Sequence, residues 1–136
     1  MSAYVVAPVV GAELRTKEVG PIGQVDVLRF AGASGDFNPL HWDPELATRA
    51  GFRAPVLMGQ YTAAMMSVWV TDQVGIERLR EFEIRFVAPV TVGDTLTFAG
   101  VVEGVNELPG SSGIRLSLEA TTASGVVARA SALIGS

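Results

Sequence analysis

The sequence contains no cysteine and only one histidine among its 136 residues. The absence of cysteine excludes disulfides, thiolate catalysis and cysteine-ligated zinc sites. A single histidine also argues against a histidine-rich metal site. Positive charge is scarce, since ten Lys and Arg residues face fourteen acids and no basic run occurs. We therefore expect no metal, no cofactor and no nucleic-acid partner.

Long apolar runs are missing as well. The most apolar window is residues 61–70, which is too short to span a bilayer. The first ten residues lack the basic start and the long apolar stretch of a signal peptide. Nonetheless, 49% of the residues are apolar, which is enough for the core of one globular domain over residues 1–136. The sequence predicts a soluble, cytoplasmic protein without a membrane segment.

Two short helices are predicted before residue 52. Residues 24–33 carry apolar side chains at helical spacing. The run Asp43-Pro44-Glu45 is a typical helix start, with an N-cap residue, proline at the first helical position and an acid in the first turn. Gly51 is placed to end that second helix. We therefore interpret Asp43 as a cap and not as a catalytic carboxylate.

The longest predicted helix covers residues 59–74, with Gly75 as its stop. Because residues 61–70 contain no charge, this helix is expected to be buried around most of its circumference.

After this helix the period of the apolar residues changes to two, which indicates strands with one buried face. Alternating segments lie within residues 81–86, 95–98, 114–121 and 126–133. Turn signals occur at Pro89, Gly93-Asp94, Pro109-Gly110 and Ser124-Gly125. A mixed segment at residues 13–19 predicts an edge strand. The expected class is α+β: a four-strand meander in an antiparallel sheet wrapped around one long buried helix.

The only histidine lies in the segment Ser34-Gly35-Asp36-Phe37-Asn38-Pro39-Leu40-His41. Pro39 fixes its own φ, lacks an N–H group and biases Asn38 away from helix, so this segment is predicted to be an irregular loop. Such a loop can turn the carboxylate of Asp36 and the imidazole of His41 toward one point. The two groups form a workable general acid–base pair near neutral pH.

A purely structural interpretation of the same residues is about as well supported by the sequence alone. Asp-x-Asn-Pro is ordinary turn chemistry, and Asp36 or Asn38 is suited to cap the following turn. A lone histidine is more often a structural residue than a catalyst.

The sequence resembles the MaoC-like hydratase/dehydratase family of the hotdog fold. The matching residues are Phe30-Ala31-x-x-Ser34-Gly35-Asp36-x-Asn38-Pro39-Leu40-His41-x-Asp43, then Ala50-Gly51-Phe52, Gly59, and Arg85-Phe86-x-x-Pro89-Val90-x-x-Gly93-Asp94. They cover about residues 24 to 98 in order and spacing. The chain is similar above all to single-hotdog members, namely (R)-specific enoyl-CoA hydratases and actinobacterial 3-hydroxyacyl-thioester dehydratase subunits.

The resemblance implies a hydro-lyase that adds water across the double bond of trans-2-enoyl thioesters to give (3R)-3-hydroxyacyl thioesters. Asp36 and His41 would hold the water as an acid–base pair, without assignment of the two roles. The backbone N–H of Gly59 would stabilise the charge on the thioester oxygen, because Gly59 begins the long helix. A plain helix-entry glycine is the structural alternative.

Further residues enter the site through the same resemblance. Ser67 stands eight residues after Gly59, at the spacing of a family serine that orients the pair, and Asn38 is included among the substrate-binding residues. Met65, Met66 and Trp69 are candidates for the acyl pocket. The structural alternatives are a serine bonded to its own helix and an ordinary core.

The chain departs from the family at Met58-Gly59-Gln60, where the family usually has His-Gly-Met. This departure keeps open a non-catalytic thioester-binding or partner subunit, which the presence of both Asp36 and His41 disfavours. A hotdog thioesterase, which would share the fold and the ligand, is a second alternative and is disfavoured because residues 61–70 lack an acid. The resemblance implies an acyl-CoA or acyl carrier protein substrate. It also implies a homodimer, or a heterodimer with another hotdog subunit.

Overall fold

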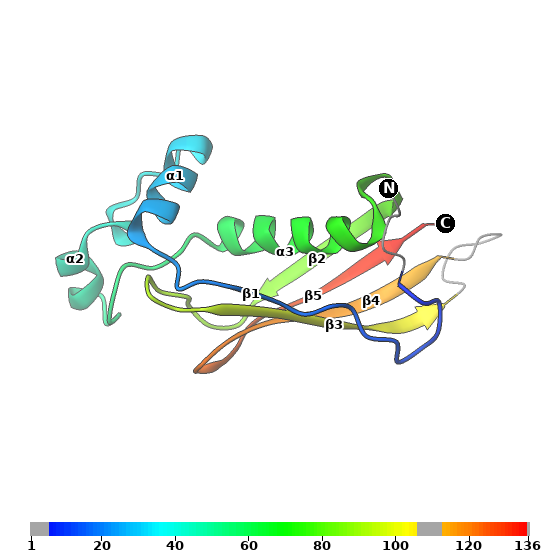
Figure 1. Ribbon diagram of the computed structural model, residues 1–136. Coiled ribbons are helices and arrows are strands. Elements are labelled where there is room, and N and C mark those ends of the chain that lie inside the picture. The colour runs from blue at the N-terminus through cyan, green and yellow to red at the C-terminus, as the bar shows by residue number, and fades with distance from the viewer. Residues whose placement is uncertain (1–5, 106–112, 136) are drawn as a thin grey trace.

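The computed structural model describes residues 6–105 and 113–135. The long helix α3 (Gly59–Val74) lies across one face of a five-stranded antiparallel sheet (Figure 1). The strands are β1 (Lys17–Val19), β2 (Leu79–Phe86), β3 (Leu96–Val105), β4 (Ile114–Thr122) and β5 (Gly125–Ile134). The short helices α1 (Gln24–Ser34) and α2 (Pro44–Arg49) gather at one end of α3. This is the α+β architecture that the sequence predicts.

The predicted helices are confirmed, and their ends follow the local signals. The Oδ1 atom of Asp43 accepts from the N–H groups of Glu45 and Leu46 at the start of α2. Gly35 and Gly51 follow α1 and α2 with φ angles of 77° and 96°, which glycine adopts without strain. No helix in the described ranges is long and apolar enough to cross a bilayer.

The strand order differs from the predicted meander. The sheet runs β1-β3-β4-β5-β2, so β2 pairs with β5, for example Phe82 opposite Ala132, and does not pair with β3. Residues 87–95, which contain the turn signals at Pro89 and Gly93-Asp94, connect distant strands instead of forming a hairpin. The meander prediction was wrong because alternation reports the buried face of a strand and carries no information about its neighbour.

The remaining strand predictions have mixed outcomes. β1 is an edge strand, but it covers only Lys17–Val19, and Glu13 contributes an isolated bridge to Val101. The predicted turn between β4 and β5 is present at Ala123 and Ser124, and Gly125 is the first residue of β5. The predicted turn at Pro109-Gly110 lies outside the described residues.

The sheet covers one side of α3 and leaves a stripe on the other side exposed. The residues of α3 that pack into the core include Met66, Trp69 and Val70. The exposed stripe contains Gln60, Ala64, Val68 and Asp72, which follow one another at intervals of four. The helix is thus buried against the sheet but not around its whole circumference.

Candidate active site

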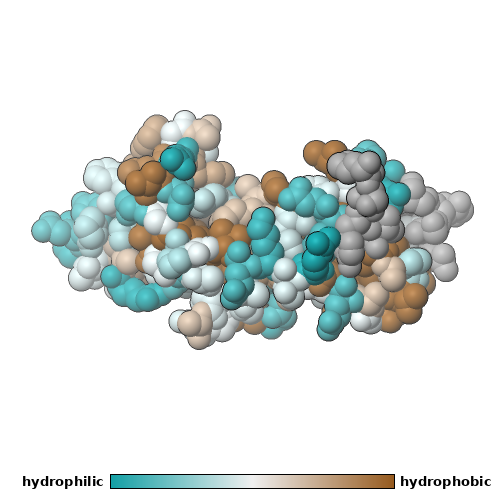
Figure 2. All heavy atoms as spheres, viewed as in Figure 1, coloured by the Kyte–Doolittle hydropathy of each residue, from teal (hydrophilic) through white to brown (hydrophobic). Residues whose placement is uncertain are grey.

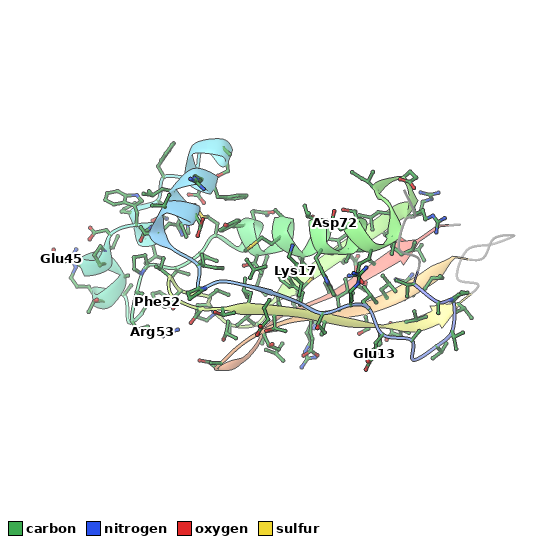
Figure 3. The ribbon with its side chains drawn as sticks, viewed as in Figure 1. Glu13, Lys17, Glu45, Phe52, Arg53 and Asp72 are labelled. Carbon is green, nitrogen blue, oxygen red and sulfur yellow. The ribbon has the colours of Figure 1, made fainter. Side chains whose placement is uncertain are left out.

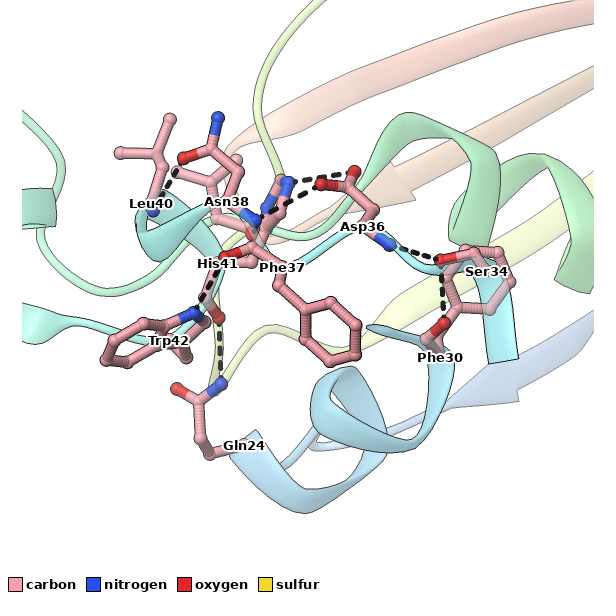
Figure 4. Close-up of polar contacts among 10 residues, drawn as sticks. Gln24, Phe30, Ser34, Asp36, Phe37, Asn38, Leu40, His41 and Trp42 are labelled. Atoms are coloured by element: carbon pink, nitrogen blue, oxygen red, sulfur yellow. Dashed lines mark hydrogen bonds and ion pairs between the residues drawn. The ribbon is translucent and has the colours of Figure 1, made fainter. Parts of the chain in front are cut away.

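The loop after α1 brings Asp36 and His41 together. Pro39–His41 form a single 3-10 turn, and the Oδ2 atom of Asp36 lies 3.3 Å from Nε2 of His41 (Figure 4). The His41 side chain is 13% exposed, whereas that of Asp36 is 46% exposed. In the described part of the chain, no group of three His, Asp or Glu side chains is arranged to hold a metal ion. The loop therefore holds a carboxylate and an imidazole in contact, and the carboxylate is partly open to solvent.

The two carboxylate oxygens of Asp36 make different contacts: one stabilises the turn and the other faces His41. The Oδ1 atom of Asp36 accepts a hydrogen bond from the N–H of Asn38 at 3.3 Å. The Oδ1 atom of Asn38 in turn accepts from the N–H of Leu40 at 3.0 Å and caps the 3-10 turn. The structure thus shows that Asn38 caps this turn, while its part in substrate binding stays a prediction. Structural and chemical interpretations of the loop are compatible.

A backbone carbonyl fixes the orientation and tautomer of His41. Its Nδ1 atom lies 2.7 Å from the carbonyl oxygen of Val56. A carbonyl oxygen only accepts hydrogen bonds, so Nδ1 carries the hydrogen and the neutral ring keeps a lone pair on Nε2. The N–H of Val56 also donates to the carbonyl of Leu40 at 3.1 Å. Sequence reasoning missed Val56, because any residue can supply a carbonyl and no side chain marks it.

Two further side chains donate hydrogen bonds to backbone carbonyls of the loop at residues 36–41. Gln24, at the start of α1, donates through Nε2 to the carbonyl of His41 at 2.8 Å. Trp42 donates through Nε1 to the carbonyl of Phe37 at 3.2 Å. Figure 4 shows both contacts beside the Asp36–His41 pair. Neither residue was predicted, since their partners are again backbone atoms.

Gly59 presents a backbone donor at the start of α3. Among the described residues its N–H group has no hydrogen-bond acceptor. Gly59 also borders a cavity of about 430 Å³, together with Leu57, Thr62, residues 86–90 and Val127. Asp36 and His41 do not line this cavity. His41 contacts the carbonyl of Val56, which is three residues, and so at most about 11 Å along the chain, from Gly59.

The structure gives Ser67 a partner on its own helix. Its Oγ atom donates to the carbonyl of Ala64 at 2.9 Å. This bond matches the structural alternative for a serine inside a helix. A role in orienting Asp36 or His41 stays a prediction.

The three acyl-pocket candidates do not border the cavity beside Gly59. Met66 is fully buried, and Met65 packs against the core. Trp69 stacks on Phe98 at 5.7 Å between ring centroids and donates through Nε1 to the carbonyl of Arg15. Their assignment to an acyl pocket stays a prediction that these contacts do not support.

The helix entry that departs from the family has an aromatic neighbour. Tyr61 stacks on Phe30 of α1 with 4.9 Å between ring centroids. Burial raises the pKa of the Tyr61 hydroxyl, Asp26 raises it further, and Arg29 opposes the shift. The phenol is therefore neutral near pH 7 and is no candidate for the general base.

Comparison with known proteins places the chain in a family. Residues 5–123 match the family model described as a MaoC like domain. Because this match covers most of the sequence, the chain belongs to the MaoC-like domain family. The hotdog fold predicted from the sequence is confirmed by the solved structures that share it.

Two relatives and one solved complex illustrate the similarity. The chain is 35% identical over 88 residues to the (R)-specific enoyl-CoA hydratase of Aeromonas caviae, covering 62% of this chain and 65% of that protein. The solved structure of the A. caviae (R)-hydratase superposes with a TM-score of 0.81 at 27% identity, over 92% of this chain and 94% of that one.

The chain is also 41% identical over 66 residues to mouse (Mus musculus) peroxisomal multifunctional enzyme type 2, covering 46% of this chain and 9% of that protein. The ChsH1–ChsH2 complex of Mycobacterium tuberculosis shares the fold, with a TM-score of 0.82 at 23% identity over 93% of this chain and 97% of that one. The matched stretches span less than two thirds of the length of both curated relatives.

Proposed function

We propose that this protein catalyses the reversible hydration of trans-2-enoyl thioesters to (3R)-3-hydroxyacyl thioesters. The observation that carries the proposal is the Asp36 carboxylate 3.3 Å from Nε2 of His41, whose other ring nitrogen is held by Val56. The similarity to an (R)-specific enoyl-CoA hydratase supports the same reaction.

The proton balance of hydration fits a pair that carries one shared proton. Water adds its oxygen to C3, one member of the pair accepts the proton that water loses, and the other member delivers a proton to C2. The pair then again holds one proton, so the cycle needs no further acid or base. Nε2 and Oδ2 are both acceptors, and a single proton or a bridging water satisfies both. The acid and base roles are therefore assigned to the pair and not to either residue alone.

Gly59 is proposed to bind the thioester oxygen, on which negative charge develops during addition. Its free N–H lies at the first residue of a 16-residue helix, where the helix dipole is positive. An N–H donor fixed in this way stabilises the transition state without reorganising during the reaction.

A thioesterase is less compatible with the structure. That reaction would use a carboxylate near Gly59 to direct water at the carbonyl carbon. The acid of α3 is Asp72, thirteen residues further along, which corresponds to about 20 Å of helix. Figure 3 shows Asp72 well away from the end of the molecule that carries α1 and α2.

We also propose that the protein acts as a dimer with a second hotdog subunit, either a copy of itself or a related chain. Large apolar side chains are exposed on and beside α1, at Val25, Leu28, Phe37 and Trp42. Figure 2 shows apolar residues gathered over this end of the molecule. A partner that covers them would also enclose the open face of Asp36. The carrier of the acyl group is proposed to be CoA or acyl carrier protein.

Crotonyl-CoA and a longer trans-2-enoyl-CoA test the reaction with one protein sample. We expect loss of enoyl absorbance, a (3R)-3-hydroxyacyl-CoA product on chiral analysis, and no release of free CoA thiol. Gln60→Ala changes an exposed residue in the first turn of α3 and serves as a control for expression and purification of a variant protein.

Release of free thiol without loss of the double bond would identify a thioesterase instead. Binding of the thioester without any turnover, in the presence of a copurified partner chain, would identify a non-catalytic subunit.

A further inference from the structure

The tautomer of His41 depends on a backbone atom in a segment that is neither helix nor strand. Residues 52–58, called the connector here, join α2 to α3 and contain only an isolated bridge between Val56 and Thr91. The Val56 carbonyl that accepts from Nδ1 of His41 is therefore not fixed by a regular element of its own. Its position is set by the contacts that hold the connector.

The connector is bound on both sides of Val56 to the turn at residues 90–94. The N–H of Leu57 donates to the carbonyl of Val90 at 2.8 Å, and the N–H of Val92 donates to the carbonyl of Pro55 at 2.9 Å. These two bonds flank Val56 and limit the directions in which its carbonyl can point. The position of the turn therefore affects the position of the Val56 carbonyl, which contacts His41.

One carboxylate, that of Asp94, holds both the turn and the connector. Its Oδ2 atom accepts from the N–H of Thr91 at 2.9 Å and from the Thr91 hydroxyl at 3.3 Å. Its Oδ1 atom forms an ion pair with Arg53, a residue of the connector. The Asp94 side chain is only 11% exposed. The bond from the Thr91 N–H is partly buried and charge-assisted, and such bonds are among the stronger hydrogen bonds in proteins.

We infer that Asp94 is a positioning residue for His41. By tying the turn at residues 90–94 to the connector, Asp94 holds the Val56 carbonyl where it selects the Nδ1–H tautomer and leaves Nε2 for the reacting water. Asp94 itself does not touch the pair. Its effect on catalysis rests on the proposed function, whereas its effect on the tautomer does not.

The single histidine makes the tautomer directly measurable. Nitrogen-15 NMR of the imidazole, at about pH 8.5 where an ordinary histidine is neutral, reports Nδ1–H against Nε2–H without overlap from other residues. We compare the wild type with Asp94→Ala, Asp94→Asn and the control Glu45→Gln. Glu45 is an exposed acid at the same end of the molecule (Figure 3), and its loss removes the same charge.

The wild type and Glu45→Gln are expected to be predominantly Nδ1–H, and Asp94→Ala to gain a clear Nε2–H population. The kcat for hydration should fall roughly tenfold in Asp94→Ala, the lower end of the cost of losing a supporting partner, with a smaller change in KM. Asp94→Asn should recover part of the Nδ1–H population and part of kcat, because an amide oxygen can still accept from the Thr91 N–H.

A folded Asp94→Ala variant with the wild-type tautomer ratio would overturn the inference. If Asp94→Ala does not fold, Arg53→Gln replaces it, since Arg53 is exposed and its loss frees the connector from Asp94. An unchanged tautomer ratio in Arg53→Gln would then overturn the inference as well. The NMR measurement needs no substrate, so a wild type without hydratase activity contradicts the proposed function alone.

Discussion

The two carboxylate oxygens of Asp36 connect the folding of the loop to the proposed chemistry. One carboxylate oxygen closes the turn onto Asn38, and the other faces Nε2 of His41. The turn therefore sets the distance between the carboxylate and the imidazole. The sequence predicted this pair because a lone histidine followed a carboxylate across a proline-containing loop. It did not predict Val56 or Gln24, because their contacts involve backbone atoms that residue types do not reveal.

The hydroxyl of Ser67 provides a test of whether a residue on α3 orients the Asp36–His41 pair. We expect Ser67→Ala to lower kcat/KM less than loss of Asp36 or His41, because a serine that orients the pair transfers no proton. Steady-state hydration kinetics measure this difference. Kinetics equal to the wild type would leave the bond to Ala64 as the only role of the hydroxyl.

Gly59 has a packing neighbour that the sequence did not reveal. A Cβ atom at this position would lie 3.0 Å from Cε2 and Cζ of Phe86, so the ring of Phe86 packs directly on the glycine. The Phe86 ring is 47% exposed and has room to shift. We predict that Gly59→Ala changes the free energy of unfolding by no more than about 1 kcal/mol but lowers kcat/KM, because the ring moves at the edge of the cavity.

Gly59→Val should lower kcat/KM further than Gly59→Ala. Thermal unfolding measures the effect on stability, and hydration kinetics measure the effect on kcat/KM. The double variant with Phe86→Leu measures the coupling between positions 59 and 86. Unchanged kinetics in Gly59→Val would place the oxyanion site elsewhere.

At the scale of elements, signals at element ends predicted helices better than alternation predicted strand partners. Asp43, Gly51 and Gly75 marked helix ends through local bonds that form within a few residues. The pairing of β2 with β5 depends instead on contacts about 50 residues apart in sequence, such as Phe82 with Ala132. No local pattern encodes that choice.

Asp43 provides a prediction at this scale. Asp43→Ala removes the side-chain cap of α2 and should lower the free energy of unfolding by about 1 kcal/mol. Because the side chain of Asp43 bonds only to the start of α2, we expect kcat to stay within about twofold of the wild type, a change of under 0.5 kcal/mol. Chemical denaturation and kinetics at a temperature below the transition measure the two quantities. A large loss of kcat with an intact fold would make Asp43 part of the chemistry.

At the scale of the whole molecule, the site is assembled from segments that are distant in sequence. The loop at residues 36–41, the connector at residues 52–58 and the turn at residues 90–94 meet at one end of α3. The sheet and α3 supply the platform, and the core between them is filled by side chains such as Met66 and Phe98. The sequence predicted the platform, but the convergence of the three segments required the tertiary structure.

Met66 tests whether the core doubles as an acyl pocket. Met66→Leu nearly conserves volume and should cost less than about 1.5 kcal/mol of stability. If Met66 belongs to the core alone, the ratio of kcat/KM for short and longer enoyl-CoA substrates should not change. A shifted chain-length preference in a stable Met66→Leu variant would restore the acyl-pocket prediction.

The most direct test of the account is the hydration rate of crotonyl-CoA in His41→Ala and Asp36→Asn, with circular dichroism to confirm the fold. We expect the wild type to hydrate the substrate and each variant to lose nearly all activity, because removing either member breaks the proton cycle of the pair. A folded variant that retains near wild-type turnover would contradict the assignment of Asp36 and His41 as the catalytic pair.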